Sequence, residues 1–482
     1  MSEQLNTTRQ LADFVANTRY ADLGEDVVEY TKMIILDTLI CGIAAGSMER
    51  SRMMHEIVRR QGGVAQASIF GIEGRYPAPL AVMANAEMMN ALDADDTFFS
   101  SSHFAAFNVA AALAESQKSR AGGKQMILGT AVGFDVNARL NLASQVFVED
   151  ADGQVRWSKV MGMGFSSFGT AATAASIRGL DSAKTRNLFG LLSSFAPTPT
   201  VNTMGERTEL PSFKYANYAA TAHAGMLALD FADVGYTANQ TCLDGDGFLL
   251  AQGCLGADEA LLLEDLGKNW WILETAVKYY PSCRYTHGAI DLLLGLMHEE
   301  SITAQMIERV EVRMNPMAYA HRLFRDPARS IAFDHCAPFS GQFNIPYVLA
   351  LAALGIPRGP RWYEQETLAD TNVWNLAHRI QTTEDPDAMD EVRKSRSERI
   401  KRFRKSPASI KVRANGREYE RRCDYVSGDP WSEPTRVTWS ALEAKLASFC
   451  DGIMSPSQMA DLVRTAKTLE AVDDLRTALN FP

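Results

Sequence analysis

Ionisable side chains gather between two apolar segments over residues 91–108, ALDADDTFFSSSHFAAFN. Asp93, Asp95, Asp96 and His103 supply carboxylates and an imidazole, the groups that most often move protons in enzymes. The same stretch holds four phenylalanines, which is atypical of a solvated loop. We therefore expect a buried pocket wall whose acids and His103 face a cavity.

The protonation state of His103 depends on the helix that follows it. Residues 109–115 favour a helix, and if Ser102 is its N-cap, His103 lies in the first turn, where the positive end of the helix dipole disfavours imidazolium. A neutral histidine near a carboxylate is a candidate general base. The alternative is structural: Asp95 and Asp96 cap and turn the chain, and His103 is a hydrogen-bonded core residue.

The elements that position this stretch are expected to be helices. Apolar residues recur at helical spacing from Asp26 to Gly46. Further helices are predicted at residues 77–91, 123–140, 166–179 and 182–195. The chain up to about residue 268 thus reads as all-helical, with one short strand or turn at 67–72. Asp37, inside an apolar run, is predicted to be a satisfied structural carboxylate.

Strand patterns appear only after residue 268. Apolar residues alternate over residues 310–314 and 410–414, and Asn415-Gly416 is a strong hairpin turn. Helices are expected at 340–354 and 373–381. The sequence therefore predicts an α+β domain over residues 269–438, followed by helices over 439–482.

Length and composition place the chain among ordinary globular proteins. It has 482 residues, of which 46% are hydrophobic and 22% charged, and this length exceeds what one compact core usually supports. No apolar run reaches membrane-spanning length, and MSEQLNTTRQ lacks the build of a signal peptide. We expect a cytoplasmic protein without a membrane partner.

The cysteines and the net charge argue against several kinds of site. Seven cysteines occur without a C-x-x-C pair, which is typical of reduced thiols and disfavours disulfides and zinc or iron–sulfur sites. A net charge of −10 disfavours nonspecific nucleic-acid binding and requires a locally positive pocket for any anionic substrate. The cysteines are Cys41, Cys242, Cys254, Cys283, Cys336, Cys423 and Cys450.

One basic segment, residues 391–405, contrasts with this acidic background. It carries eight lysines and arginines. Its composition favours a solvated helix or loop. The alternative, binding of a nucleic acid or another anionic partner, would require strongly salt-dependent association.

Ordered motifs extend over nearly the whole chain. They include VVEYTKMIILDTLICGIAAGS (27–47), ALDADDTFFSSSHF (91–104), PSFKYANYAATAHAG (211–225), KYYPSCRYTHGAID (278–291) and SGQFNIPYVLALA (340–352). Together they resemble the MmgE/PrpD family, which holds 2-methylcitrate dehydratases, cis-aconitate decarboxylases and iminodisuccinate epimerases. The second motif resembles the DFDDTxxxxxHPS signature of that family, and the fourth resembles KxYPxCxxxHxxID.

The resemblance implies a mostly α fold with an α+β part. A large helical domain would span residues 1–268, an inserted α+β lid domain residues 269–438, and C-terminal helices at 439–482 would return to the first domain. It also implies a homodimer built through the helical domain, and no cofactor or metal.

The resemblance also implies roles for individual residues. It assigns Asp93 and His103 to proton transfer and Thr97 to hydrogen bonding or orientation. It makes Lys214 a ligand for a substrate carboxylate, although its residue type alone favours a snorkelling surface lysine. Arg284, a two-pronged donor, would bind another carboxylate at the domain boundary.

Some assignments remain open, because the chain departs from the family pattern. His287, at the same boundary, is expected either to contact substrate or to be a capping or core histidine. The family's second histidine, in GFHPTxxxGxxG, is replaced by Val160 within WSKVMGMGFSSFG (157–169), with Lys159 beside it. The HPS triplet has become His103-Phe104-Ala105. Lys159 and Phe104 are therefore further candidates for substrate binding, and the aromatic residues suggest a less polar substrate than a tricarboxylate.

Three functions follow from these observations. The first is a metal-independent lyase or isomerase that removes a proton next to a carboxylate of a small carboxylic acid, as dehydratase, decarboxylase or epimerase. Loss of the second histidine removes a candidate acid for hydroxide departure. The second is a catalytically altered paralogue that binds a metabolite or a partner without turnover. The third is nucleic-acid binding through residues 391–405, which the overall acidity disfavours.

Overall fold

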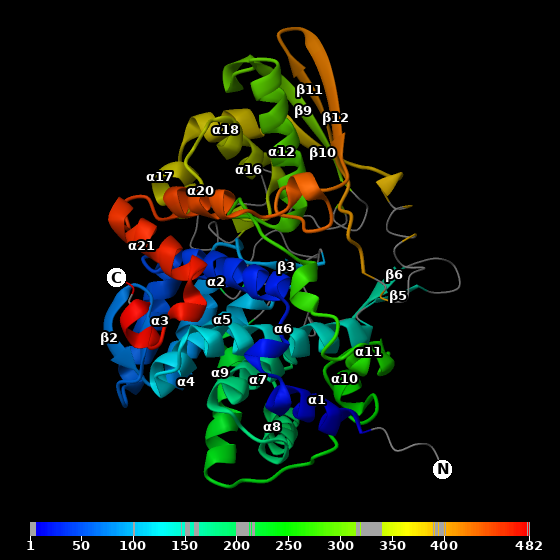
Figure 1. Ribbon diagram of the computed structural model, residues 1–482. Coiled ribbons are helices and arrows are strands. Elements are labelled where there is room, and N and C mark those ends of the chain that lie inside the picture. The colour runs from blue at the N-terminus through cyan, green and yellow to red at the C-terminus, as the bar shows by residue number, and fades with distance from the viewer. Residues whose placement is uncertain are drawn as a thin grey trace.

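Helices form most of the protein (Figure 1). The computed structural model describes residues 6–99, 102–145, 147–149, 155–158, 163–198, 212, 214, 217–314, 319, 340–388, 390, 394, 400, 402–479 and 481. No helix in these ranges is long and apolar enough to cross a membrane. The six cysteines in these ranges are free thiols, as predicted.

The larger part of the fold is a helical assembly. Its principal helices are α1 (Thr7–Asn17), α2 (Glu25–Ala45), α3 (Glu49–Gln61), α4 (Ala78–Met89), α5 (Ala105–Ser119), α6 (Gly123–Ala143), α7 (Ser166–Arg178), α8 (Ser182–Phe195) and α9 (Tyr218–Asp233). Shorter helices α10 (Gly247–Ala251) and α11 (Ala260–Leu263) follow. The predicted helices in this region are thus confirmed within a few residues.

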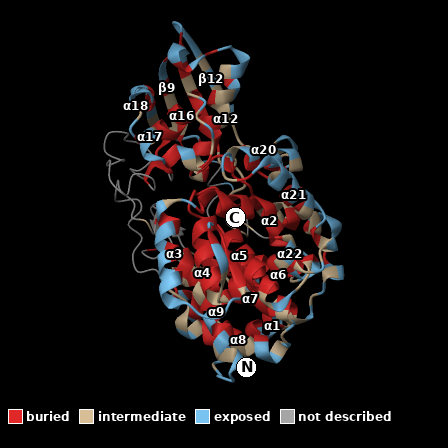
Figure 2. Cartoon of the chain, turned by 90° about the vertical axis from the view of Figure 1, so that its left-hand side faces the viewer, coloured by how far each residue is buried: buried red, intermediate tan, exposed pale blue. Residues whose placement is uncertain are grey.

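Small side chains let the central helices pack closely. Helices α4 to α7 are buried over most of their surface (Figure 2). A Cβ atom on Gly133 of α6 would lie only 1.9 Å from Oγ1 of Thr173 in α7. The alanine- and glycine-rich sequence of these helices therefore permits a contact that larger residues would block.

Short strand pairs interrupt the helical part. They are β1 (Ala67–Ile69) with β2 (Ile72–Tyr76), β3 (Thr97–Phe98) with β8 (Thr275–Ala276), β4 (Ser144–Gln145) with β7 (Gly256–Ala257), and β5 (Phe147–Glu149) with β6 (Val155–Trp157). Of these, only a short strand or turn at 67–72 was expected. Strands of two or three residues carry too little alternation to be recognised by periodicity.

A four-stranded sheet with helices forms the upper part of Figure 1. Its strands follow the order β10 (Ile380–Glu384), β9 (Ile307–Met314), β11 (Ala408–Ala414), β12 (Arg417–Cys423), with β9 and β10 parallel and the other pairs antiparallel. Its helices include α12 (Arg284–Glu299), α16 (Ile345–Ala353), α17 (Gln365–Leu368) and α18 (Thr371–Ala377). The α+β character is confirmed, and so is the hairpin turn, where Asn415 and Gly416 have φ of 50° and 73°.

Two expectations about this part were wrong in detail. The helix expected at 373–381 ends at Ala377, and Ile380 begins the edge strand β10 instead, because Ile380 pairs with Val310 of β9. The helix expected at 340–354 has its regular portion from Ile345, where the side chain of Asn344 caps it by accepting from the backbone of Tyr347 at 2.9 Å.

The last helices return to the first ones. Helices α20 (Trp439–Phe449) and α21 (Pro456–Lys467) pack on α2, and the short α22 (Leu475–Ala478) packs on α5 (Figure 1). Lys445 of α20 donates to Oδ1 of Asp37 in α2 at 2.5 Å, and both side chains are fully buried. Oδ1 of Asp37 is thus satisfied, as expected of a structural carboxylate, whereas Oδ2 has no hydrogen-bond partner among the described residues.

Candidate active site

The acidic stretch forms a buried loop between α4 and α5. All its described residues from Ala91 to Asn108 are buried. Asp93 has a φ of 53°, a conformation that costs energy in a non-glycine residue and is frequent at functional sites. Thr97 pairs with Ala276 across strands β3 and β8, which brings the loop beside the segment that leads into α12. The predicted burial of this stretch is therefore confirmed.

Two buried lysines converge on Asp93. Nζ of Lys214 donates to Oδ1 of Asp93 at 3.0 Å, and Nζ of Lys278 donates to Oδ2 at 3.0 Å. Lys278 also donates to the backbone oxygen of Asp93 at 2.8 Å. The structure thus places Lys214 inside the protein with Asp93, not at the surface as its residue type alone suggested.

The two ammonium groups control the ionisation of Asp93. Burial by itself would raise the pKa of this carboxyl, but the positive charges of Lys214 and Lys278 outweigh burial and hold its pKa well below the usual range. Burial lowers the pKa of Lys214 to about 8, against the opposing effect of Asp93. The pKa of Lys278 is raised, because Asp93 and Asp95 overcome its burial.

The donors of the two lysines are used differently. Lys214 has acceptors for three protons, since it also donates to the backbone oxygen of Asn90 at 2.6 Å and to Oε1 of Gln342 at 3.2 Å. Within the described part of the chain, Lys278 has two acceptors, both on Asp93, while an ammonium group carries three protons. Lys278 therefore has a donor left for an oxygen of a bound molecule.

His103 lies in the loop before helix α5, not in its first turn. The helix begins at Ala105, with Phe104 as N-cap residue, because the carboxylate of Asp96 accepts from the backbone N–H groups of Phe104 at 3.1 Å and Ala105 at 2.8 Å. The condition that Ser102 is the N-cap was wrong. The acid that satisfies the helix N-terminus is instead seven residues upstream of His103.

The local geometry nevertheless favours a neutral His103. Its Nδ1 lies 2.5 Å from the backbone oxygen of Asp96, which can only accept, so Nδ1 carries a proton. Burial and the nearby charge of Lys278 lower the pKa of His103. In the neutral form the lone pair must then reside on Nε2, which makes this atom a base.

Asp95 and Asp96 hold the loop together. Asp95 accepts from Nδ2 of Asn90 at 3.0 Å. Burial and the neighbouring charge of Asp95 raise the pKa of Asp96 well above its usual range. The capping and turning role considered for these two acids is present in the structure, alongside the charged cluster around Asp93.

Thr97 lies at the edge of the same loop. It is buried, and its Oγ1 has no hydrogen-bond partner among the residues that the structure describes. A buried hydroxyl without a partner carries a desolvation cost that a bound polar group would relieve. This observation is compatible with the orienting role that the sequence suggested.

Arg284 and His287 have other partners. The guanidinium of Arg284 is paired with Asp429 and also donates to the backbone oxygen of Ser427 at 3.2 Å, so its fork is already occupied by the protein. Nε2 of His287 lies 3.1 Å from the backbone oxygen of Ser282. Burial and Arg284 lower the pKa of His287 well below its usual range, which favours the core histidine that was one of the two alternatives.

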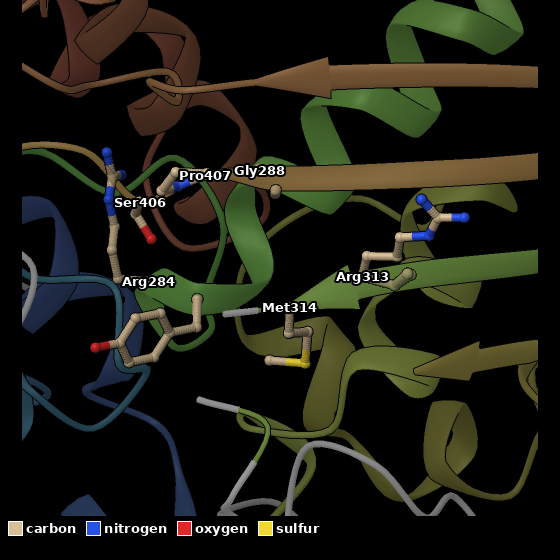
Figure 3. Close-up of a pocket in the computed structure, with 9 residues that line it drawn as sticks. Arg284, Gly288, Arg313, Met314, Ser406 and Pro407 are labelled. Carbon is tan, nitrogen blue, oxygen red and sulfur yellow. The ribbon is translucent and has the colours of Figure 1, made fainter. Parts of the chain in front are cut away.

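The cavity beside Arg284 is too small for a substrate (Figure 3). Its volume is about 10 Å³, room for about one water molecule. It lies between α12 and β9, with Arg284 and Arg313 on opposite sides. The cavity beside Arg284 is therefore not a substrate site.

The structure gives no support to Phe104 or Lys159 as substrate-binding residues. The ring of Phe104 is fully buried and packs against Phe98 and Phe134, with ring centres 5.5 and 5.6 Å away. It lies in an aromatic core, not on an open wall. Lys159 and Val160 are outside the described residues.

Lys278 and Gln342 were not recognised from the sequence as site residues. Both lie within quoted motifs, Lys278 as the first residue of KYYPSCRYTHGAID, and a lysine opening a family motif was the available signal. Gln342 joins Lys214 to the loop, because its Nε2 donates to the backbone oxygen of Ala91 at 2.8 Å. Among the described residues, no three histidine, cysteine, aspartate or glutamate side chains are arranged to hold a metal ion.

A helical scaffold with an attached α+β part and a buried aspartate–lysine–histidine cluster defines the class of protein. The MmgE/PrpD N-terminal domain matches residues 9–258, and the MmgE/PrpD C-terminal domain matches residues 280–470. The chain therefore belongs to the MmgE/PrpD family.

Two relatives extend along much of the chain. Cis-aconitate decarboxylase of Homo sapiens is 23% identical over 495 residues, which cover 98% of this chain and 95% of the relative. The cis-aconitate decarboxylase-like protein oryM of Aspergillus oryzae is 24% identical over 393 residues, which cover 77% of this chain and 78% of the relative.

Proposed function

We propose that this protein is a lyase of the decarboxylase or dehydratase type that acts on a small carboxylic acid, without a metal ion. One observation carries the proposal: the buried carboxylate of Asp93 holds two lysines beside a neutral histidine. The names of the two relatives support decarboxylation over epimerisation.

His103 serves as the proton-transfer group in this proposal. A carbon acid next to a carboxylate is weak, so a base must lie close to it and the resulting negative charge must be stabilised. In dehydration, Nε2 of neutral His103 accepts the proton from carbon and the imidazolium returns it to the departing hydroxide, which leaves as water. In decarboxylation, the C–C bond breaks to release CO2, and the carbanion takes its proton from the imidazolium form of His103. The charges of Lys278 and Asp93 are near enough to His103 to affect its pKa, so the base and the cationic donors share one site.

Lys278 supplies the electrophilic contact. Its remaining N–H donates to a substrate carboxylate oxygen, where negative charge grows as the proton leaves. One preorganised donor of this kind contributes on the order of 3 kcal/mol to transition-state stabilisation. Lys214, with three acceptors in the protein, keeps Asn90, Asp93 and Gln342 in place and adds positive charge to the same site.

Asp93 takes a different role from the one suggested by the sequence. A carboxylate with a pKa held well below its usual range is a poor base, because its proton affinity is low. We assign Asp93 to orienting Lys214 and Lys278, and leave proton transfer to His103. Arg284 is not needed in this scheme, since Asp429 already occupies its guanidinium.

The oligomeric state and the cellular location also remain proposals. The family resemblance suggests a homodimer built through the helical part, and the cysteines and N-terminal sequence suggest a cytoplasmic location. The second candidate function, binding of a metabolite or partner without turnover, is favoured by one feature, the valine at position 160 where the family has a histidine.

Proton NMR in deuterated water tests the proposal. Wild type, His103→Ala and Lys278→Met are incubated with 2-methylcitrate, cis-aconitate, iminodisuccinate and less polar hydroxy or unsaturated acids. A matched control is His378→Ala, since His378 is an exposed histidine at the end of α18. We expect conversion by wild type and the control, and a loss of at least about a hundredfold in His103→Ala.

The outcomes separate the two functions. Undiminished turnover by His103→Ala would remove the assignment of the base. No conversion of any acid by wild type, together with a rise in Tm on addition of one of them, would favour the binding paralogue. The identity of the product distinguishes dehydration, decarboxylation and epimerisation.

A further inference from the structure

Arg402 of the basic segment is buried in the helical part of the protein. Its side chain is 8% exposed, whereas the composition of residues 391–405 favoured a solvated segment. Its guanidinium donates to the backbone oxygen of Asn141 and, at 3.2 Å, to that of Ser144. Nε also lies 3.4 Å from Oδ1 of Asn141.

These acceptors belong to the C-terminal end of helix α6. The last carbonyl groups of a helix lack partners within the helix, and the helix dipole gives that end negative character. An arginine that comes from the chain just before β11 satisfies both needs. Burial lowers the pKa of Arg402 to about 10, which still leaves the guanidinium charged at neutral pH.

Asn141 connects this contact to the buried loop between α4 and α5, which carries Asp93 and His103 and is called the catalytic loop below. Its Nδ2 donates to Oγ of Ser102 at 3.0 Å. Ser102 is also fixed by its backbone, which exchanges hydrogen bonds with Phe98 at 2.6 and 3.3 Å, and it directly precedes His103. The contacts of Arg402 therefore reach, through one amide and one hydroxyl, the residue next to the proposed base.

We propose that Arg402 is a positioning residue that orients His103 through Asn141 and Ser102. This inference rests on the proposed role of His103 as base. Arg402 fixes the Asn141 amide so that it donates to Ser102. Ser102 directly precedes His103, whose Nδ1 donates to the backbone oxygen of Asp96. The inference gives the inner end of the basic segment a role in the site.

The position of His103 can be measured without any substrate. In 15N-histidine-labelled protein, the ring nitrogen shifts report the fraction of the tautomer protonated at Nδ1, and His103→Gln identifies the signal. We expect wild type to hold one tautomer, and Arg402→Met and Ser102→Ala to show a mixture. Lys405→Met is the matched control, because Lys405 lies in the same segment but pairs with Asp424 at 3.1 Å.

Kinetics on the acid found to be converted provide the second readout. We expect kcat to fall on the order of tenfold to a hundredfold in Arg402→Met and in Ser102→Ala, with KM little changed, because the base is misplaced while binding remains. The double variant should lose no more than the worse single variant, since both changes break one chain of contacts. Arg402→Lys keeps the charge but not the two-pronged guanidinium, so its kcat should lie between those of wild type and Arg402→Met.

Several results would overturn the inference. One is a folded Arg402→Met protein in which His103 keeps the same tautomer as in wild type and only the Tm is lowered. Another is a fall in kcat in the double variant that equals the product of the falls in the two single variants. If Arg402→Met does not fold, Arg402→Lys and Ser102→Ala decide in the same way. A wild type without turnover refutes the proposed function but still allows the tautomer measurement, so the two failures are distinguishable.

Discussion

Two buried aspartates pair with lysine in the part of the chain that the structure describes, and they differ in the number of lysines. Asp37 of α2 has one, Lys445, at 2.5 Å. Asp93 of the catalytic loop has two, Lys214 and Lys278, each at 3.0 Å. All these side chains are essentially inaccessible to solvent, so burial acts on both carboxylates in the same direction.

The additional lysine reverses the balance between burial and ion pairing. Burial raises the pKa of Asp37 to about 6 despite its contact with Lys445. With two ammonium groups, the pKa of Asp93 is instead held well below its usual range. A single buried ion pair thus does not compensate fully for desolvation, whereas the cluster at the site does. The backbone differs as well, because Asp37 lies in a regular helix and Asp93 has a φ of 53°.

The largest expected effect comes from removing one lysine of the site. Lys278→Met leaves Asp93 with one ammonium, as in Asp37, and removes the proposed substrate donor. We expect kcat/KM to fall by on the order of 10² to 10³. Lys411→Met is a suitable control, since Lys411 forms a surface pair with Glu418 at 3.2 Å. Steady-state kinetics on the converted acid decide, and a change below about tenfold would contradict the role of Lys278.

Removing the lysine of the other pair should affect folding first. Lys445→Met leaves Asp37 buried without its partner, and we expect a loss of about 3 to 5 kcal/mol in the free energy of unfolding. Lys467→Met, which breaks the exposed pair with Glu443, should cost about 0 to 1 kcal/mol. Urea denaturation measures both.

Part of the stability lost in Lys445→Met should return in the double variant with Asp37→Asn. That variant no longer buries an unpaired carboxyl. If the single and double variants were equally unstable, Lys445 would contribute through packing and not through its charge. Because Lys445 also donates to the backbone oxygen of Ala94 at 2.8 Å, the kcat of the folded fraction shows whether the loss of this contact reaches the site.

The sequence predicted more of the fold than of the site. Helix positions follow apolar spacing along one segment, so α4, α6, α7 and α8 were expected within a few residues. The hairpin at Asn415-Gly416 has an equally local signal. The departures lie where tertiary pairing decides, as at Ile380, whose partner Val310 is far away in the chain.

The site was predicted in part, because its residues come from distant segments. Asp93, Lys214 and His103 were selected, and the structure brings them together. No local pattern indicates that Lys278 meets Asp93 or that Asp429 occupies Arg284. Such contacts depend on how the α+β part meets the helical part, which spacing along one segment does not encode.

The two aspartates should also respond differently to pH. The folded-state pKa of Asp37 is about 6, above its ordinary value of 3.8, so folding favours the protonated form. Its contribution to stability is therefore complete below about pH 4 and is lost as pH rises through 6, by roughly 3 kcal/mol. Asp93, with a lowered pKa, contributes above pH 4 and loses that contribution as pH falls.

Urea denaturation of wild type and Asp37→Asn between pH 4 and 7 tests this difference. As pH rises, the unfolding free energy of wild type should fall relative to that of Asp37→Asn. A constant gap would mean that Asp37 titrates at the same pH in the folded and unfolded states.

The smallest effect concerns the alkaline limit of activity. Burial lowers the pKa of Lys214 to about 8, so its ammonium loses charge and one donor as pH rises through this value. The contacts to Asn90, Asp93 and Gln342 then weaken, and kcat/KM should fall about tenfold per pH unit above pH 8. The acid limit should lie below pH 6.5, because the pKa of His103 is lowered and its neutral form persists there.

Lys214→Arg distinguishes this origin from alkaline unfolding. A guanidinium does not titrate in this range, so the alkaline limit should move upward even if the maximal rate is reduced by the altered geometry. If the limit stayed near pH 8, another group would control it. Lys214 and Lys278 would then both stay charged over the pH range of activity and would differ only in their contacts. The positive charge that holds Asp93 ionised would therefore persist throughout that range.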